Sequence, residues 1–271
     1  MRRVPLYLAL CVAMAIAMPA QAKKPAPPAA TSAPGASSST ASVDPKAIAA
    51  LNAMGGYLRG LKQFSVRADT TLDMVMDDGQ KLEFPGTVDY KVRAPNGLRV
   101  DVKSDRKERE IYFDGKTLTV YAPRMKYYAS VEAPPTIHGL LSAAEKQYGI
   151  ELPLADLFLW GTDPSQVQAL KSAVFVGPAR IGGTVTEQYA FRQDGVDWQL
   201  WVETGDKPLP RRLVITTTDD PALPNYAATL TWNTAAQFKD SSFTFAPSKD
   251  SQRIKLAEVD VLVVEDKEGT K

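Results

Sequence analysis

The sequence is poor in the residues on which most hydrolytic and redox chemistry depends. Its 271 residues include one histidine, His138, and one cysteine, Cys11. A serine or cysteine nucleophile with a histidine base would have to be built around His138, and no Gly-x-Ser-x-Gly sequence occurs. His138 follows two prolines at a predicted helix start, where a capping or surface role is the simpler interpretation. We expect no catalytic residues, and we expect that the protein is not an enzyme.

Ligand sets for metals and phosphate groups are also missing from the sequence. Zinc sites need clusters of cysteine and histidine, and the Asp-x-Asp-x-Asp-Gly loop of calcium sites does not occur. Gly55-Gly56 and Gly182-Gly183 lack the spacing of phosphate-binding loops. We therefore expect neither a metal nor a cofactor. Paired carboxylates for glycoside hydrolysis stay open, because acidic residues on separate strands can converge, although the sequence singles out no pair.

The first 22 residues have the layout of a secretory signal peptide. Two arginines open it, residues 4–18 are apolar, and Ala20-Gln21-Ala22 is a small-x-small cleavage site. The apolar run has about 15 residues, whereas a membrane span needs about 20. We expect cleavage after Ala22 and a periplasmic protein whose mature chain has no transmembrane segment. Cys11 is lost with the signal peptide, which leaves no cysteine for a disulfide.

The charge of the chain argues against a nucleic-acid partner. The formal net charge of +1 becomes about −1 when the two leader arginines are removed, and a near-neutral chain has no bulk attraction for phosphate backbones. Residues 23–43 are a low-complexity run of Ala, Pro, Ser and Thr, which cannot offset the entropy lost on folding. We expect a disordered tether over residues 23–43 and a single folded domain over residues 44–271.

The strongest pattern in the chain is the alternation of apolar and polar residues between Gln63 and Arg93. Even positions from Phe64 to Met76 are mostly apolar, and the alternation resumes in phase after the Asp77-Asp78-Gly79 turn. This pattern predicts a long antiparallel hairpin with one apolar face. Burial contributes roughly 1.5–3 kcal/mol for each large side chain. Either the protein's own helices or a bound molecule therefore covers this face.

The same alternation occurs on both sides of a helical region. Helical spacing begins at Asp44-Pro45 and returns between Thr136 and Lys171. The strands that follow end with Phe243-Thr244-Phe245. About eleven one-sided strands predict an α+β fold, a large curved antiparallel sheet (an open or half β-barrel) with helices covering its concave face. A two-sheet sandwich is the competing architecture, because its strands alternate too.

Two features favour a cavity over an ordinary core on the apolar face. The hairpin strands have about 12 to 14 residues where 5 or 6 is usual, and the predicted helices are short for so wide a sheet. Met74 and Met76 would suit a surface that adapts to flexible chains. Residues Leu157–Trp160 are apolar on every side of a helical turn. That run is either a core helix or a mobile lid on an apolar cavity.

The order of these parts resembles the LolA-like periplasmic lipoprotein carriers and their LppX relatives. The likeness covers the whole chain after the tether, and its most specific piece is Asp114-Gly115-Lys116-Thr117-Leu118 with Tyr121 and Pro123. The chain is most similar to a family of predicted periplasmic proteins of unknown function that shares this fold. The resemblance implies an incomplete barrel with a helical lid and an apolar cavity that shields acyl chains.

The resemblance and the alternation together place large apolar side chains on the cavity wall and lid. These predicted site residues are Val66, Leu72, Met74, Phe84, Val88, Tyr90, Leu98, Val100, Leu118, Val120, Leu157, Trp160, Trp198, Leu200 and Trp232. One position departs from the carriers, in which an arginine that helps to hold the lid shut precedes the proline before the third strand. This chain has Ala94 there, so the resemblance supports lipid binding but does not support the carriers' switchable release mechanism.

We therefore expect a non-enzymatic periplasmic protein that binds a lipid or a lipoprotein acyl chain in an apolar cavity between the sheet and a helical lid. The alternative is a sensor or interaction module on the same fold that recognises another envelope protein through its loops. This alternative predicts a filled cavity and an exposed patch near residues 219–225 or the helical insert.

Overall fold

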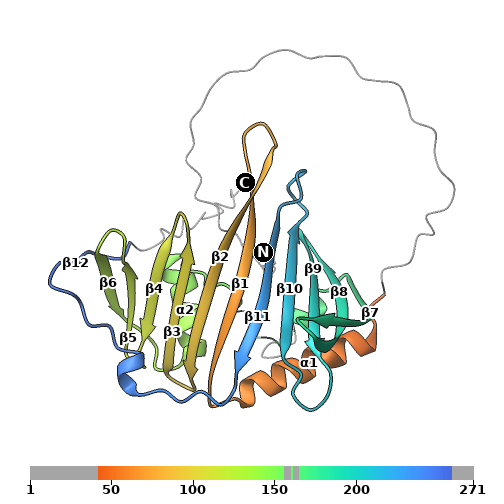
Figure 1. The fold of residues 1–271 in the computed structure, drawn as a ribbon, viewed down its shortest axis with the longest axis horizontal. Helices are drawn as coiled ribbons and strands as arrows, with labels where there is room; N and C mark the ends of the chain where they lie inside the picture. Colours follow the sequence, from red (N-terminus) through yellow and green to blue (C-terminus); the bar gives the residue numbers. More distant parts are fainter. Residues whose placement is uncertain (1–41, 156–159, 161–164, 258–271) are drawn as a thin grey trace, which may run out of the picture.

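The structure, a computed structural model, describes residues 42–155, 160 and 165–257. The predicted signal peptide, nearly all of the tether and Leu157 lie outside these residues. The described chain forms one twelve-stranded sheet with a few helices against one face (Figure 1). The predicted α+β fold with a large open sheet is confirmed. The two-sheet sandwich is excluded, because all twelve strands belong to the same sheet.

The two halves of the chain meet in the middle of the sheet, where β1 pairs with β11. The strand order is β12-β6-β5-β4-β3-β2-β1-β11-β10-β9-β8-β7. The first half contributes β1 (Gln63–Val75), β2 (Lys81–Arg93), β3 (Gly97–Ser104), β4 (Glu108–Phe113), β5 (Thr117–Ala122) and β6 (Tyr127–Glu132). The second half contributes β7 (Ser172–Ile181), β8 (Thr184–Gln193), β9 (Val196–Glu203), β10 (Pro210–Thr217), β11 (Asn225–Asn233) and β12 (Gln252–Arg253).

The sheet stays open, with β7 and β12 as its edges. The pairs between named strands are antiparallel, except that the short β12 runs parallel to β6. A closed barrel would require the two edge strands to pair, and β7 and β12 lie at opposite ends of the strand order. The sheet is therefore open, as the sequence predicts.

Local capping residues set the ends of the helices. In α1 (Pro45–Gly60), Asp44 accepts a hydrogen bond from the Lys46 amide at 2.8 Å, and a proline occupies the first turn. In α2 (Ile137–Tyr148), the Thr136 hydroxyl accepts from the Gly139 amide at 3.1 Å, and the helix ends at Gly149 with a left-handed φ of 61°. The described chain also contains a short α4 (Ser165–Gln168) and a 3₁₀ turn, η1 (Asp240–Ser242).

The core lies between the helices and one face of the sheet. Phe64 and Val66 are each 2% exposed, whereas Arg67 between Val66 and Ala68 is exposed. The predicted alternation is thus confirmed in the first half of β1. Towards the hairpin tip the exposed fraction rises to 42% at Met74 and 47% at Met76.

The tip is exposed because the hairpin extends past its neighbours, as Figure 1 shows. Pairing of β1 with β11 ends at Leu72, and pairing of β2 with β3 ends at Gly86. Residues 73–85 of the two strands therefore pair only with each other within the described structure.

The prediction of a strand at Phe243-Thr244-Phe245 is wrong, since these residues form a turn and coil after η1. Their apolar side chains attach the coil to the sheet instead of pairing as a strand. Phe243 is 1% exposed, and its ring lies 3.0 Å from the place where Gly97 would carry a Cβ. The Phe245 ring contacts three tyrosine rings at centroid distances of 5.4, 5.0 and 5.0 Å, namely those of Tyr112, Tyr121 and Tyr128.

Candidate apolar binding site

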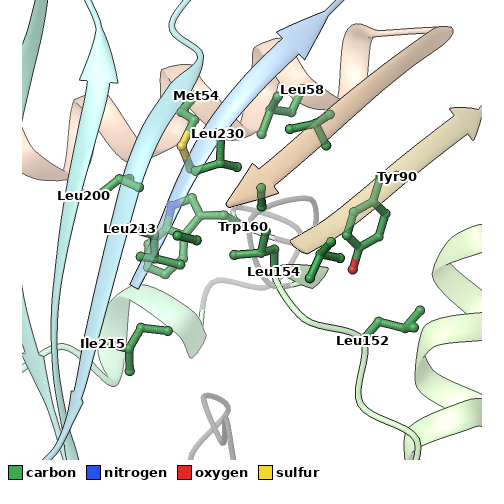
Figure 2. Packing of buried hydrophobic residues seen from close by; sticks show 14 of the residues in the cluster. Met54, Leu58, Tyr90, Leu152, Leu154, Trp160, Leu200, Leu213, Ile215 and Leu230 are labelled. Carbon is green, nitrogen blue, oxygen red and sulfur yellow. The ribbon is translucent and has the colours of Figure 1, made fainter. Parts of the chain in front are cut away.

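The protein's own side chains fill most of the concave face. Leu51, Met54 and Leu58 of α1 are each at most 3% exposed, and Leu140 of α2 is 1% exposed. The segment between α2 and α4 adds three buried side chains, those of Leu152, Leu154 and Trp160. Figure 2 shows Leu154 and Trp160 among side chains from α1 and from the strands, including Leu200, Leu213 and Leu230.

Polar contacts fix the segment around Trp160 to the rest of the fold. The Tyr90 hydroxyl on β2 donates to the Pro153 carbonyl, and the Arg59 guanidinium on α1 donates to the Trp160 carbonyl. Gly55 makes the second contact possible, because an ideal Cβ at this position would lie 2.5 Å from the Trp160 carbonyl oxygen. Only a glycine leaves room for so close a backbone approach.

Aromatic rings cover the sheet beneath this segment. The Trp160 ring meets Trp198 of β9 edge-on at a centroid distance of 5.8 Å. Trp198 also stacks on Phe191 at 4.0 Å and donates its indole N–H to Gln193 at 3.0 Å. Trp160 and Trp198, both predicted as site residues, therefore pack against each other.

An apolar pocket lies on this face, between the end of α1, the start of α2 and strands β1 to β3. Its volume is about 360 Å³. Its lining residues are Leu58, Arg59, Leu61, Phe64, Tyr90, Val92, Ala94, Pro95, Leu98, Thr136, Ile137, His138, Leu141 and Ala155. Among the described residues, the lining contains no acidic side chain, and its polar members are Arg59, Tyr90, Thr136 and His138. The arrangement can shield an apolar chain and present donors at one end.

The structure places the predicted site residues in several different environments. Tyr90 and Leu98 line the pocket. Seven others are buried in the core at 5% exposure or less, namely Val66, Val88, Val100, Leu118, Trp160, Trp198 and Leu200. Leu72, Val120 and Trp232 are partly buried against that core. Met74 is exposed on the projecting hairpin, and the Arg106 guanidinium lies 4.1 Å from the centre of the half-buried Phe84 ring.

Sequence reasoning missed most of the helical side of the pocket. Phe64 and Val92 belong to the alternation of the hairpin and could have been included on that signal. Leu61, Ile137 and Leu141 could not, because helical periodicity does not tell which strand a helix covers. Ala94, recognised as a departure from the carriers, turns out to line the pocket. An arginine there would place a long charged side chain where this chain has a methyl group.

A larger hollow of about 820 Å³ lies over β1, β2, β3, β10 and β11 and has a different chemistry. Its lining mixes acidic, basic and hydroxyl side chains, among them Asp69, Glu83, Lys103 and Arg212. Asp69 is paired with Arg67 at 3.3 Å, and Arg212 donates to the Thr229 hydroxyl at 3.0 Å. Asp69 and Arg212 therefore already have partners within the protein, so this hollow is a weaker candidate than the apolar pocket.

The titratable groups with shifted pKa values lie away from the apolar pocket. Burial raises the pKa of Tyr226, and burial together with an acidic neighbour raises the pKa of Tyr112 and Tyr189. None of the three tyrosines lines the pocket. Among the residues that the structure describes, no group of three or more His, Cys, Asp or Glu side chains could hold a metal ion.

By its fold, the chain is an α+β protein built on one open, mostly antiparallel sheet with an apolar pocket on its helical face. It belongs to the family of predicted periplasmic proteins designated DUF2092, whose model matches residues 47–257. This match confirms the family of predicted periplasmic proteins to which the sequence is most similar. No curated protein matches the chain. The described part of the chain has no helix with both the length and the apolar character needed to cross a membrane.

The chain is similar to several solved structures, among them the following three. The lipoprotein LppX of Mycobacterium tuberculosis is 14% identical, with a TM-score of 0.46, over 72% of this chain and 98% of LppX. LprF of Mycobacterium bovis is 16% identical, with a TM-score of 0.41, over 73% of this chain and 97% of LprF. A LolA superfamily protein of Nitrosomonas europaea is 10% identical, with a TM-score of 0.37, over 73% of this chain and 97% of that protein.

Proposed function

We propose that this protein is a non-enzymatic periplasmic protein that binds a lipid or lipoprotein acyl chain in the pocket between α1, α2 and strands β1 to β3. The pocket itself is the observation that supports the proposal. Its 360 Å³ are lined mainly by aliphatic and aromatic side chains, and small-ligand sites of roughly 300–1,000 Å³ have this character. Apolar contact contributes about 25 cal/mol for each Å² removed from water.

The proposal assigns different roles to the residues expected from the sequence. Tyr90 and Leu98 contact the ligand, and Val66, Val88 and Val100 support the wall from neighbouring positions on the same strands. The proposal includes export with cleavage after Ala22, a tether over residues 23–43 and a single domain over residues 44–271. Membership of a predicted periplasmic family supports the location.

The first test is lipid analysis of the protein purified from the envelope under native conditions. We expect a co-purifying lipid in the wild type and its loss in Leu141→Trp, because the indole ring fills the pocket that Leu141 lines. Gln147→Trp on the exposed side of the same helix is the matched control and should retain the lipid. Both variants are compared by mass spectrometry of the extracted lipid. A wild type that carries no lipid and binds none when it is offered would refute the proposal.

A second candidate function is recognition of another envelope protein through the end of the sheet that carries the projecting hairpin. Leu223 in the β10–β11 loop is 46% exposed, and Met76 at the hairpin tip is 47% exposed. The loop is tied to the hairpin, because the Lys81 ammonium lies 3.4 Å from the Leu223 carbonyl. An exposed apolar patch near residues 219–225 is what this alternative predicts. The same lipid analysis separates the two functions, since an interaction module carries no lipid in either variant or in the wild type.

A further inference from the structure

We infer that the apolar pocket selects an amphiphile with one acyl chain and an anionic head group, held at the head end by Arg59 and His138. This inference rests on the proposed function, because it specifies the ligand class of the same pocket. It is carried by the size of the pocket, by the position of its polar side chains and by the sign of their charge.

The size of the pocket limits the number of chains. Its 360 Å³ lie near the lower end of the roughly 300–1,000 Å³ of small-ligand pockets. The neighbouring part of the concave face is occupied by Leu154 and Trp160, which are 3% and 5% exposed. We therefore expect the remaining space to admit one aliphatic chain and to exclude the second chain of a diacyl lipid.

The exposed lining residues of the pocket are mostly polar, and its buried lining residues are mostly apolar. Phe64 and Leu98 are each 2% exposed at the sheet. Arg59, Thr136 and His138 are exposed at the neighbouring helix ends. Tyr90, the polar residue on the sheet side, donates its hydroxyl hydrogen to the Pro153 carbonyl. A ligand would therefore place its chain against the sheet and its head group beside the helix ends.

The charge at the polar end favours an anion. Arg59 carries a guanidinium cation with five N–H groups, and within the described structure it donates to the Trp160 carbonyl. His138 adds a ring N–H donor. Because no acidic side chain of the described residues lines the pocket, an anionic head gains charge-assisted hydrogen bonds from these donors. A free fatty acid and a lysophospholipid share this chemistry.

A displacement assay tests the inference on the whole mature protein. The probe is N-phenyl-1-naphthylamine, an uncharged dye whose fluorescence rises in apolar sites, so its binding reports the pocket itself. The competitors, used below their micelle concentrations, are palmitate, palmitoyl lysophosphatidylglycerol, hexadecanol and monopalmitoylglycerol. We expect the two anions to displace the dye at about tenfold lower concentration than the two neutral lipids, which corresponds to about 1.4 kcal/mol.

Variants at the polar end separate charge from packing. Arg59→Gln keeps an N–H donor for the Trp160 carbonyl and removes the charge, so dye binding should persist while the preference for anions falls several-fold. The double variant Arg59→Gln with His138→Gln should abolish the preference, and Arg59→Lys should retain most of it. Lys146→Gln, at the far end of α2, is the control for loss of one positive charge and should change nothing.

The outcomes distinguish this inference from the proposed function. Displacement by palmitate alone would assign a fatty acid, and displacement by the lysophospholipid alone would assign a phosphate head group; either result supports the inference. Equal displacement by anionic and neutral lipids would overturn it and leave acyl binding intact. Stronger binding of a diacyl phosphatidylglycerol would also overturn it. A wild type that binds neither dye nor lipid would refute the proposed function together with the inference.

Discussion

At the residue scale, the two adjacent glycines of α1 have different roles. Glycine in a helix interior costs about 1 kcal/mol of helix stability relative to alanine, so a glycine there is either required by a close contact or tolerated at that cost. Gly55 is buried against the Trp160 backbone, whereas Gly56 is exposed and has no heavy atom within 4 Å of an ideal Cβ. The sequence presents the pair as equivalent. The difference arises from a contact more than 100 positions away in the chain.

We predict opposite effects of alanine at these two positions. Gly55→Ala should lower the free energy of unfolding by about 1–3 kcal/mol, because the new methyl group collides with backbone that cannot move away cheaply. Gly56→Ala should raise it by up to about 1 kcal/mol through helix propensity alone. Urea unfolding followed by circular dichroism measures both changes. Equal stabilities of the two variants would show that the Trp160 carbonyl does not lie against α1.

At the scale of elements, the long hairpin could be predicted from the sequence but its projection could not. Its alternation gave two strands of about the right length, and the structure has 13 residues in each. Where β11 and β3 stop pairing depends on the lengths of those strands, which the hairpin's own sequence does not contain. The strand predicted at Phe243-Thr244-Phe245 is wrong for a different reason. Two apolar residues that flank a polar one fit a strand and an anchored coil equally well.

The base of the projection is fastened by Asp73. Its carboxylate accepts from the Asn225 backbone amide at 3.0 Å and lies 3.3 Å from the Lys81 ammonium. Burial alone would raise the pKa of Asp73, but the hydrogen bonds from Asn225 and Lys81 outweigh burial and hold it below its usual value of 3.8. A lowered pKa in the folded state means that the contribution to stability is present above the unfolded-state pKa. It is lost as the pH falls through the folded-state pKa.

We therefore predict a pH-dependent difference between the wild type and Asp73→Asn. At pH 7 the variant should be less stable by about 1 kcal/mol, because a charged acceptor has become neutral. The difference should shrink as the pH falls below the usual carboxyl range and vanish once Asp73 is protonated in the native state. Urea midpoints at several pH values between 7 and 2.5 measure it. A difference that stays constant over this range would mean that Asp73 does not carry a stabilising charge.

The candidate site could be predicted only in part, again because of how elements combine. Tyr90 and Leu98 follow from strand alternation, and the pocket does include them. The other side of the pocket is set by where α1 ends and α2 begins over the sheet, which periodicity within one helix does not encode. Val66, Val100 and Leu200 were also expected to line a cavity because of strand alternation. Their strands face the helices, but α1, Leu154 and Trp160 occupy the space above the sheet.

At the scale of the whole molecule, the central β1–β11 pair joins the two halves of the chain in one sheet. The register runs over eight residue pairs from Ser65 with Asn233 to Leu72 with Tyr226. Side chains reinforce it, since the Phe64 and Trp232 rings lie 5.6 Å apart and the Trp232 indole donates to the Pro210 carbonyl at 2.7 Å. The concave core is also continuous from Val100 in the first half to Leu200 in the second. Such an arrangement should unfold as one unit.

We predict that a destabilising substitution in one half of the sheet lowers the urea midpoint of both halves equally. Val100→Ala, at a site with no exposed surface, should cost about 1–3 kcal/mol through lost apolar contact and the cavity left behind. Tryptophan fluorescence reports mainly the second half of the sheet, where Trp198, Trp201 and Trp232 lie, and far-ultraviolet circular dichroism reports the whole sheet. Both signals should shift to the same lower urea midpoint. Val120→Ala is the milder control, because Val120 is only partly buried on β5. A fluorescence midpoint that stays at the wild-type value in Val100→Ala would instead mean that the two halves of the sheet unfold as independent units.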